Sequence, residues 1–194
     1  MLVDLHCHTQ PRSACSALQA IQLVRLAAER GLDAICLTEH DRAWDEEALA
    51  ALRAASPIPV FHGVELTTGL GHVLAFGLPP HEYSPVAADV ARAAQRSGAL
   101  LYLAHPARDG LLRVTRETVE YFVSVEAANG SDSRIQNIAA AGLAKGFRLP
   151  DIGGSDAHTE AEVGRAATRF HMPLRTDADL LEALATGRYE AILR

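Results

Sequence analysis

The chain has 194 residues, of which 48% are hydrophobic and 22% charged, a composition typical of one globular domain with a sizeable core. Its net charge of -6 argues against a broad basic surface, so we expect no duplex nucleic acid as a partner. No signal-peptide pattern, membrane span or disulfide framework is evident, because apolar runs are short and the three cysteines are an odd, sparse set. We therefore expect a soluble cytoplasmic protein without membrane contact, folded as a single domain over residues 1–194.

Short apolar runs alternate with stretches of helical period along the chain. The predicted strands span residues 2–5, 34–38, 59–66, 72–77, 99–104, 122–127, 151–154, 167–171 and 189–193. The predicted helices span residues 17–30, 45–55, 85–97, 115–120, 131–145 and 177–186. Such alternation predicts a largely parallel sheet with helices outside it. Because the chain is short for eight strand–helix units, we predict an α/β fold with a seven-stranded or distorted (β/α) barrel.

Six of the nine histidines stand at ends of predicted strands, five of them at C-terminal ends. These histidines are His6, His8, His40, His72, His105 and His158, and the acids Glu65 and Asp156 stand beside them at strand ends. The C-terminal ends of strands in a parallel barrel converge on one face, so we expect these side chains to meet. A His-x-His spacing in an extended segment also places both imidazoles on one side. Imidazole and carboxylate together suit zinc, manganese or iron.

Five segments resemble the successive motifs of the PHP family, which is named for polymerase and histidinol phosphatase domains. They are Asp4-Leu5-His6-Cys7-His8-Thr9, Leu37-Thr38-Glu39-His40-Asp41, Gly63-Val64-Glu65, Ala104-His105-Pro106 and Gly154-Ser155-Asp156-Ala157-His158. The matches run in order from residue 4 to residue 158. The resemblance implies a distorted seven-stranded barrel that hydrolyses phosphate esters with two or three divalent metal ions.

The resemblance also implies three ion sites, carried over position by position. The first would be held by His6, His8, Glu65 and Asp156; the second by Glu65 as a bridge with His72 and His105; the third by His40 and His158. The family often adds an acidic residue or a histidine shortly after His-x-His, and this chain has neither between Thr9 and Cys15. A Cys15 thiolate, a water molecule, or a weak or absent third ion are the open alternatives there.

The chemistry expected of this cluster is hydrolysis by a metal-bound hydroxide, because a divalent ion can lower the pKa of water from 15.7 to about 7. Asp156 and Glu65 are the candidate catalytic residues, with Asp156 as a proton acceptor and Glu65 as the bridge between ions. Phosphate recognition favours arginine, whose guanidinium group binds phosphate bidentately. The candidates near strand-end loops are Arg12, Arg108, Arg134 and Arg165, with Arg134 preferred, and Asn129 as a substrate or ligand-orienting contact.

The leading hypothesis is a hydrolase of a small phosphate ester, such as a mononucleotide, a short oligonucleotide or another phosphomonoester, with manganese, zinc or iron as cofactor. One alternative is an amidohydrolase-like enzyme that cleaves C–N bonds. That class normally uses a carboxylated lysine, and Lys145, the single lysine, lies at a predicted helix end. A catalytically silent metal-binding accessory domain is the other alternative. The preference for monoesters or diesters and the oligomeric state stay open.

Overall fold

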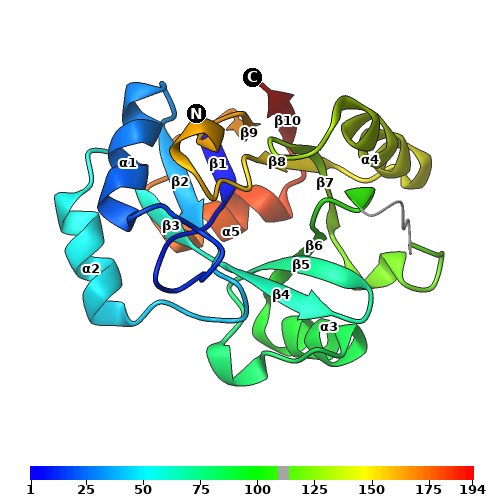
Figure 1. Cartoon of the computed structure of the whole chain (residues 1–194). Coiled ribbons are helices and arrows are strands. Elements are labelled where there is room, and N and C mark those ends of the chain that lie inside the picture. Colours follow the sequence, from blue (N-terminus) through cyan, green and yellow to red (C-terminus); the bar gives the residue numbers. More distant parts are fainter. Residues whose placement is uncertain (109–113) are drawn as a thin grey trace.

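The computed structural model describes residues 1–108 and 114–194, which form two five-stranded sheets flanked by helices (Figure 1). In the order β10-β9-β1-β2-β3, the first sheet contains β1 (Leu2–Cys7), β2 (Ala34–Leu37), β3 (Val60–His62), β9 (Ala166–Phe170) and β10 (Tyr189–Leu193). In the order β4-β5-β6-β7-β8, the second contains β4 (Val64–Thr68), β5 (Gly71–Phe76), β6 (Leu100–Leu103), β7 (Ser124–Asn129) and β8 (Asp151–Gly154).

Of the helices in the described residues, all but the last cover outer faces of the sheets, and the last packs against the core that both sheets share. The helices are α1 (Ala20–Glu29), α2 (Glu46–Ala55), α3 (Ala87–Ser97), α4 (Arg134–Phe147) and α5 (Asp177–Ala185). Helix α1 packs on β2, α3 on β6 and α4 on β7, whereas α5 contacts β3 and β6 and so touches both sheets. Among the described helices, none combines the length and the apolar character needed to cross a bilayer.

The predicted seven-stranded barrel is not confirmed, because the described residues form ten strands in two sheets. The expected dominance of parallel pairing is wrong, since four strand pairs are parallel and four are antiparallel. The predicted strand 59–66 is divided at Gly63 into β3 and β4, which belong to different sheets. A Cβ at Gly63 would lie 2.9 Å from Cδ1 of Phe76 and 3.0 Å from the Ala75 carbonyl oxygen, so glycine permits this close crossing.

Two predicted helices also differ from the structure. Residues 115–120 form turns and the start of a 3₁₀ turn, Val119–Tyr121. The Thr115 backbone N–H donates to Thr118 Oγ1 and the Thr118 N–H to Thr115 Oγ1, and such local bonds compete with helical ones. Helix α1 begins at Ala20 instead of residue 17, because the Leu18 carbonyl accepts from the Gln10 N–H at 2.8 Å and is not available for a helical bond.

The two sheets share one core and meet at one end. Leu5, Phe61 and Phe76 pack in the same buried cluster as Tyr102 and Ile152, which joins strands of both sheets. Beyond the end of β8, Asp156 donates its N–H to the His6 carbonyl at 2.7 Å, and His8 donates to the Ala157 carbonyl at 3.1 Å. At the same end, Glu65 donates to the Glu39 carbonyl at 3.0 Å, next to His40. These crossings bring the ends of β1, β2 and β8 to β4.

Candidate metal centre

All eight predicted ligand residues lie together where the sheets meet. Five imidazoles lie within 3.2 Å of the Glu65 carboxylate, and His158 lies 3.6 Å from Asp156; the five are His6, His8, His40, His72 and His105. The acids Glu65 and Asp156 are buried, with exposed side-chain fractions of 1% and 2%. Predicted strand ends that are up to 152 positions apart in the sequence therefore converge on a single cluster.

Four ligand atoms of this cluster have the spacing of a tetrahedral metal site. Nε2 of His6 and Nε2 of His8 are 3.0 Å apart, and they lie 3.2 and 3.1 Å from Oε2 of Glu65. Oδ1 of Asp156 is 3.4 Å from the His6 nitrogen and 3.2 Å from the His8 nitrogen. A tetrahedron with metal–ligand bonds of about 2.0–2.1 Å has edges of about 3.3–3.4 Å. The four atoms therefore fit one small divalent ion.

Hydrogen bonds on the far side of the rings orient His6 and His8 toward this point. Nδ1 of His6 lies 2.9 Å from Oε1 of Glu126, which as a carboxylate only accepts, so the neutral His6 ring carries its hydrogen on Nδ1. Nδ1 of His8 lies 3.3 Å from Oγ of Ser13, whose own hydrogen goes to Oε2 of Glu39 at 2.5 Å. Both neutral rings consequently direct an Nε2 lone pair at the acids, the arrangement of metal-bound histidines.

Glu65 is the central acceptor, and one of its oxygens lacks a donor. Oε2 of Glu65 is buried and accepts no hydrogen bond among the described residues. Burial raises the pKa of Glu65, but the charge of His6 and hydrogen bonds from His105 outweigh it, so the pKa falls well below its ordinary value. An ionised, buried carboxylate needs a compensating positive charge, which a protonated imidazole or a divalent ion can supply. The donor set thus fits a divalent ion.

In the absence of an ion, a proton competes for the same position. Burial lowers the pKa of His6, but the charges of Glu126, Asp156 and Glu65 outweigh burial and raise it well above its ordinary value. At His40, burial prevails and lowers the pKa to about 4. Because a ligating imidazole must be deprotonated, the affinity for metal is expected to fall as the pH falls.

Glu65 also stands between two ligand groups. Nδ1 of His72 lies 2.8 Å and Nε2 of His105 lies 3.0 Å from Oε1, whereas Nδ1 of His40 lies 3.1 Å from Oε2. The ligand atoms of His40, Glu65 and His72 all lie within 4.8 Å of one another. This carboxylate therefore occupies a bridging position, with His40 closer to the second group than the motif assignment predicts.

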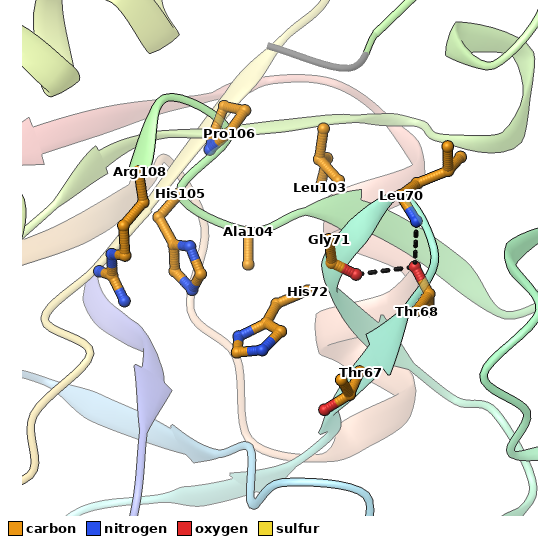
Figure 2. A pocket seen from close by; sticks show the side chains of 10 residues that line it. All are labelled: Thr67, Thr68, Leu70, Gly71, His72, Leu103, Ala104, His105, Pro106 and Arg108. Carbon is orange, nitrogen blue, oxygen red and sulfur yellow. Dashed lines mark hydrogen bonds between the residues drawn. The ribbon is translucent and has the colours of Figure 1, made fainter. Parts of the chain in front are cut away.

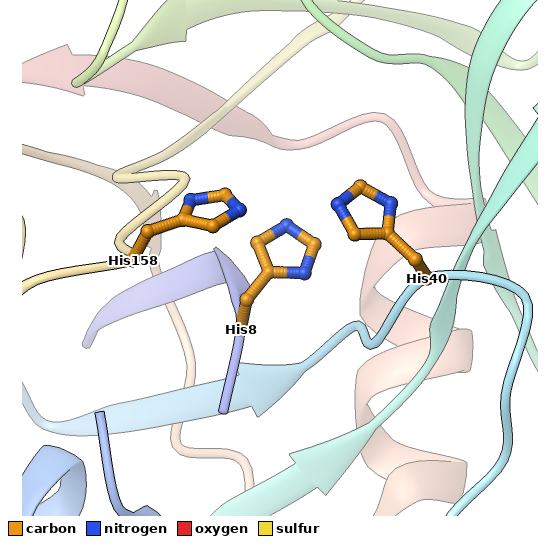
Figure 3. A group of neighbouring side chains, drawn as sticks. All are labelled: His8, His40 and His158. Carbon is orange, nitrogen blue, oxygen red and sulfur yellow. The ribbon is translucent and has the colours of Figure 1, made fainter. Parts of the chain in front are cut away.

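A third group consists of three imidazoles without an acid. The ligand atoms of His8, His40 and His158 lie within 4.8 Å of one another, and their rings are side by side (Figure 3). Nδ1 of His158 lies 2.9 Å from the Asp156 carbonyl, an acceptor, so the neutral His158 ring has its lone pair on Nε2. Cys15 is exposed and belongs to none of the ligand groups found among the described residues. Burial raises the pKa of its thiol, which disfavours the thiolate.

Backbone strain accompanies two of these residues. His105 and Asp156 have φ values of 27° and 53°, in the left-handed region that residues with a side chain rarely adopt. Each is held there by a bond from its own N–H: His105 donates to Oε2 of Glu126 at 3.0 Å and Asp156 to the His6 carbonyl at 2.7 Å. Strain of this kind costs roughly 1–3 kcal/mol and is concentrated at functional sites.

Glu126 was not singled out from the sequence, although it is a buried organiser of the cluster. Its carboxylate accepts hydrogen bonds from Nδ1 of His6 at 2.9 Å, from the His105 N–H at 3.0 Å and from Nδ2 of Asn129 at 2.9 Å. Its signal was available, because it is an acid near the end of a predicted apolar strand, as Glu65 is. Glu39 has a similar role, accepting from Thr9, Ser13 and the Trp44 indole.

Glu126→Gln is expected to weaken metal binding by about 10–100-fold. The amide has one acceptor oxygen for three donors, so the His6 ring loses its fixed orientation. The dissociation constant for zinc, measured by competition with a chromogenic chelator, tests this expectation. The exposed Glu29→Gln on α1 is the matched control, and equal affinities of the two variants would contradict the role.

Of the arginine candidates, Arg108 contacts the cluster. Its Nη2 donates to Oδ2 of Asp156 at 2.6 Å and to Oδ1 of Asn129 at 3.0 Å, and its Nε donates to Oδ1 of Asp132 at 2.8 Å. Asn129 is buried and also donates from Nδ2 to Oδ2 of Asp156 at 3.3 Å, which matches the ligand-orienting alternative.

The other predicted substrate-binding arginines lie elsewhere. Arg134, the preferred one, and Arg165 are exposed, and neither contacts a histidine or an acid of the cluster among the residues described. Arg12 pairs with Asp45 at 2.6 Å and stacks 3.6 Å above the Trp44 ring. Sequence spacing placed all of them near strand-end loops but could not show which side chain turns inward.

Comparisons with known proteins agree with the motifs. A family described as PHP-associated matches residues 134–189, and a family of unknown function, DUF6282, matches residues 1–76. A two-domain protein from Bacteroides vulgatus that contains a predicted PHP-like metal-dependent phosphoesterase has a similar fold, with a TM-score of 0.75 and 24% identity over 100% of this chain and 65% of that one. The resemblance to the PHP family is confirmed.

Two further comparisons are with named enzymes. A 3',5'-nucleoside bisphosphate phosphatase from Chromobacterium violaceum is 32% identical over 84 residues, which are 41% of this chain and 29% of that protein. The match therefore spans less than a third of the relative. An amidohydrolase from the same species, solved with sulfate and no metal, shares the fold with a TM-score of 0.66 and 19% identity over 98% of this chain and 97% of that one.

Proposed function

We propose that this chain is one PHP-type domain that hydrolyses a small phosphate ester with two or three divalent metal ions. The observation that carries the proposal is the convergence of four ligand atoms on one buried point. Neutral His6 and His8 direct Nε2 lone pairs at Glu65 and Asp156, and Oε2 of Glu65 has no donor among the described residues. Only a cation satisfies all four atoms together.

In this proposal each ion is held by its own group of ligand residues. His6, His8, Glu65 and Asp156 hold the first ion, Glu65 with His72, His105 and His40 the second, and His8, His40 and His158 the third. Manganese, zinc and iron all accept such imidazole and carboxylate ligands. When bound, such ions lower the pKa of water and screen the negative charge of phosphate oxygens.

The protein side chains position the ester and maintain the cluster. Arg108, at the edge of the cluster, is the cation placed to attract the phosphate, and it replaces Arg134 as our candidate. Asp156 acts as a ligand in preference to a base: although burial raises its pKa, His6, His8 and Arg108 bring it well below the ordinary value. In the reaction, a bond forms between phosphorus and the water oxygen, the ester P–O bond breaks, and the water proton passes to the leaving oxygen.

The phosphatase relative supports this substrate class, because its name specifies a small phosphorylated nucleoside. The two acids and six histidines of the cluster are all present, which argues against a catalytically silent domain. The amidohydrolase neighbour keeps C–N hydrolysis as a second candidate. The exposed Lys145 is in helix α4, however, and Glu65 occupies the bridging position that a carboxylated lysine takes in that class.

Removal of metal from the purified protein is expected to abolish hydrolysis of an aryl phosphate, and added manganese to restore it. His8→Ala is expected to lower the rate by at least about 100-fold, because His8 belongs to two ligand groups. The measurements are metal content by mass spectrometry and released phosphate over aryl-phosphate, nucleotide and amide substrates.

His171→Ala serves as the control, since His171 is exposed outside the cluster. Bound metal without turnover of any phosphate ester, or turnover of amides alone, would overturn the proposal.

A further inference from the structure

A cavity of about 260 Å³ opens directly beside the metal centre (Figure 2). It lies between the β4–β5 hairpin and the segment that leaves β6. His72 and His105 belong both to its wall and to the metal centre, and Arg108 stands at the same end. An ester whose phosphate sits on the cluster therefore has this space immediately next to it.

The opposite wall of the cavity is apolar. Leu70, Leu103 and Pro106 line it, together with small residues. When an apolar ligand group covers such a wall, the free energy of binding becomes more favourable because apolar surface leaves water. The wall has no hydrogen-bond or ionic partner for a charged group. A ligand group that displaces water from it is consequently apolar on that side.

The threonine hydroxyls that line the cavity already form hydrogen bonds within the protein, and the charged group of the described lining is a positively charged arginine. Oγ1 of Thr68 donates to the Gly71 carbonyl at 2.7 Å and accepts from the Leu70 N–H at 3.2 Å, and Oγ1 of Thr67 donates to Asp41 at 2.8 Å. The guanidinium of Arg108 is the charged group of the lining, and no carboxylate lines the cavity among the described residues. A cationic ligand group would therefore meet no lining carboxylate on the described residues, and the nearby Glu65 is already surrounded by imidazoles.

The volume limits what fits. The cavity volume of about 260 Å³ is below the range of about 300–1,000 Å³ that is usual for ligand pockets. That space accommodates one ring system or a short branched chain.

We propose that this cavity is the leaving-group subsite of the enzyme and selects phosphate monoesters of compact, apolar, uncharged alcohols or phenols. The inference rests on the proposed function. The phosphate binds at the cluster beside Arg108, and the alcohol portion extends past His72 and His105 onto Leu70 and Leu103.

Binding of phosphonates to the manganese-loaded protein, measured by calorimetry, tests the subsite without turnover. Phenylphosphonate is expected to bind about tenfold more tightly than methylphosphonate, because its ring covers the apolar wall. Leu70→Trp, which fills the cavity, removes this preference, and Leu70→Ala reduces it. The control Ile138→Trp, at a position 61% exposed on α4, retains it. Equal affinities of the wild-type protein for the two phosphonates would overturn the subsite.

Kinetics test the preference for uncharged groups. The wild-type protein should hydrolyse 3,3-dimethylbutyl phosphate with a kcat/KM about tenfold above that for choline phosphate, which has the same shape with a cationic nitrogen. Equal values, or a preference for choline phosphate, would overturn the charge selection. If no phosphate ester is hydrolysed while phenylphosphonate still binds preferentially, the proposed function fails, and the cavity is an apolar binding subsite without a leaving-group role.

Discussion

Glu65→Gln is expected to release bound metal and to lower phosphate-ester hydrolysis by about 1000-fold, the scale of several kcal/mol of lost Lewis-acid assistance. Glu65 places one carboxylate oxygen 3.1–3.2 Å from His6, His8 and His40 and the other within 3.0 Å of His72 and His105. An amide keeps the shape but removes the charge and turns one of these positions into a donor.

Metal content and kcat/KM, measured on the same preparations, distinguish loss of metal from misfolding. Far-UV circular dichroism should be unchanged in Glu65→Gln, because the substitution conserves volume. Glu182→Gln, on the exposed side of α5, is the control and should retain both metal and activity. If Glu65→Gln keeps its metal and more than a tenth of the activity, then Glu65 is not the bridge.

Gly154→Ala is expected to lower the free energy of unfolding by about 3 kcal/mol or more, the upper range for overpacking in a tight interior. A Cβ at this position would lie 2.4 Å from Cβ of His6 and 2.7 Å from its backbone nitrogen. Because the obstruction includes backbone, β8 must move away from β1. That movement separates Asp156 from His6 and His8, so the substitution should also weaken metal binding.

Urea unfolding of the metal-free protein measures the free energy of unfolding. The variant Gly142→Ala is the control. Gly142 lies within α4, and a Cβ there would meet nothing within 4 Å. Alanine is favoured over glycine inside a helix by about 0.5–1 kcal/mol, so this variant should gain stability. A Gly154→Ala protein as stable as the wild type would show that the β1–β8 crossing tolerates a side chain.

The proximity of the His6 and His8 side chains was predictable from the sequence for a local reason. Strands alternate their side chains, so His6 and His8 share a side without any knowledge of the remaining fold. The ends of helices are also marked in the sequence by local residue types. One example is Gly98, which follows a run of helical period and caps the C-terminus of α3 with a φ of 76°. These features depend on a few neighbouring residues, and the structure contains them.

Long-range pairing decided what the sequence left open. Gly63 reads as an ordinary residue in one apolar run, yet packing against Phe76 makes it the point where β3 and β4 separate into two sheets. Arg108 and Arg134 both follow strand ends, and only the position of Asp132 and Asp156 turns Arg108 inward. The strand-end position of Glu126 is visible in the sequence, but its contact with His6, 120 positions away, is visible only in the tertiary structure. Local periodicity specifies which residues share a face, whereas partners distant in sequence are selected by packing of the whole chain.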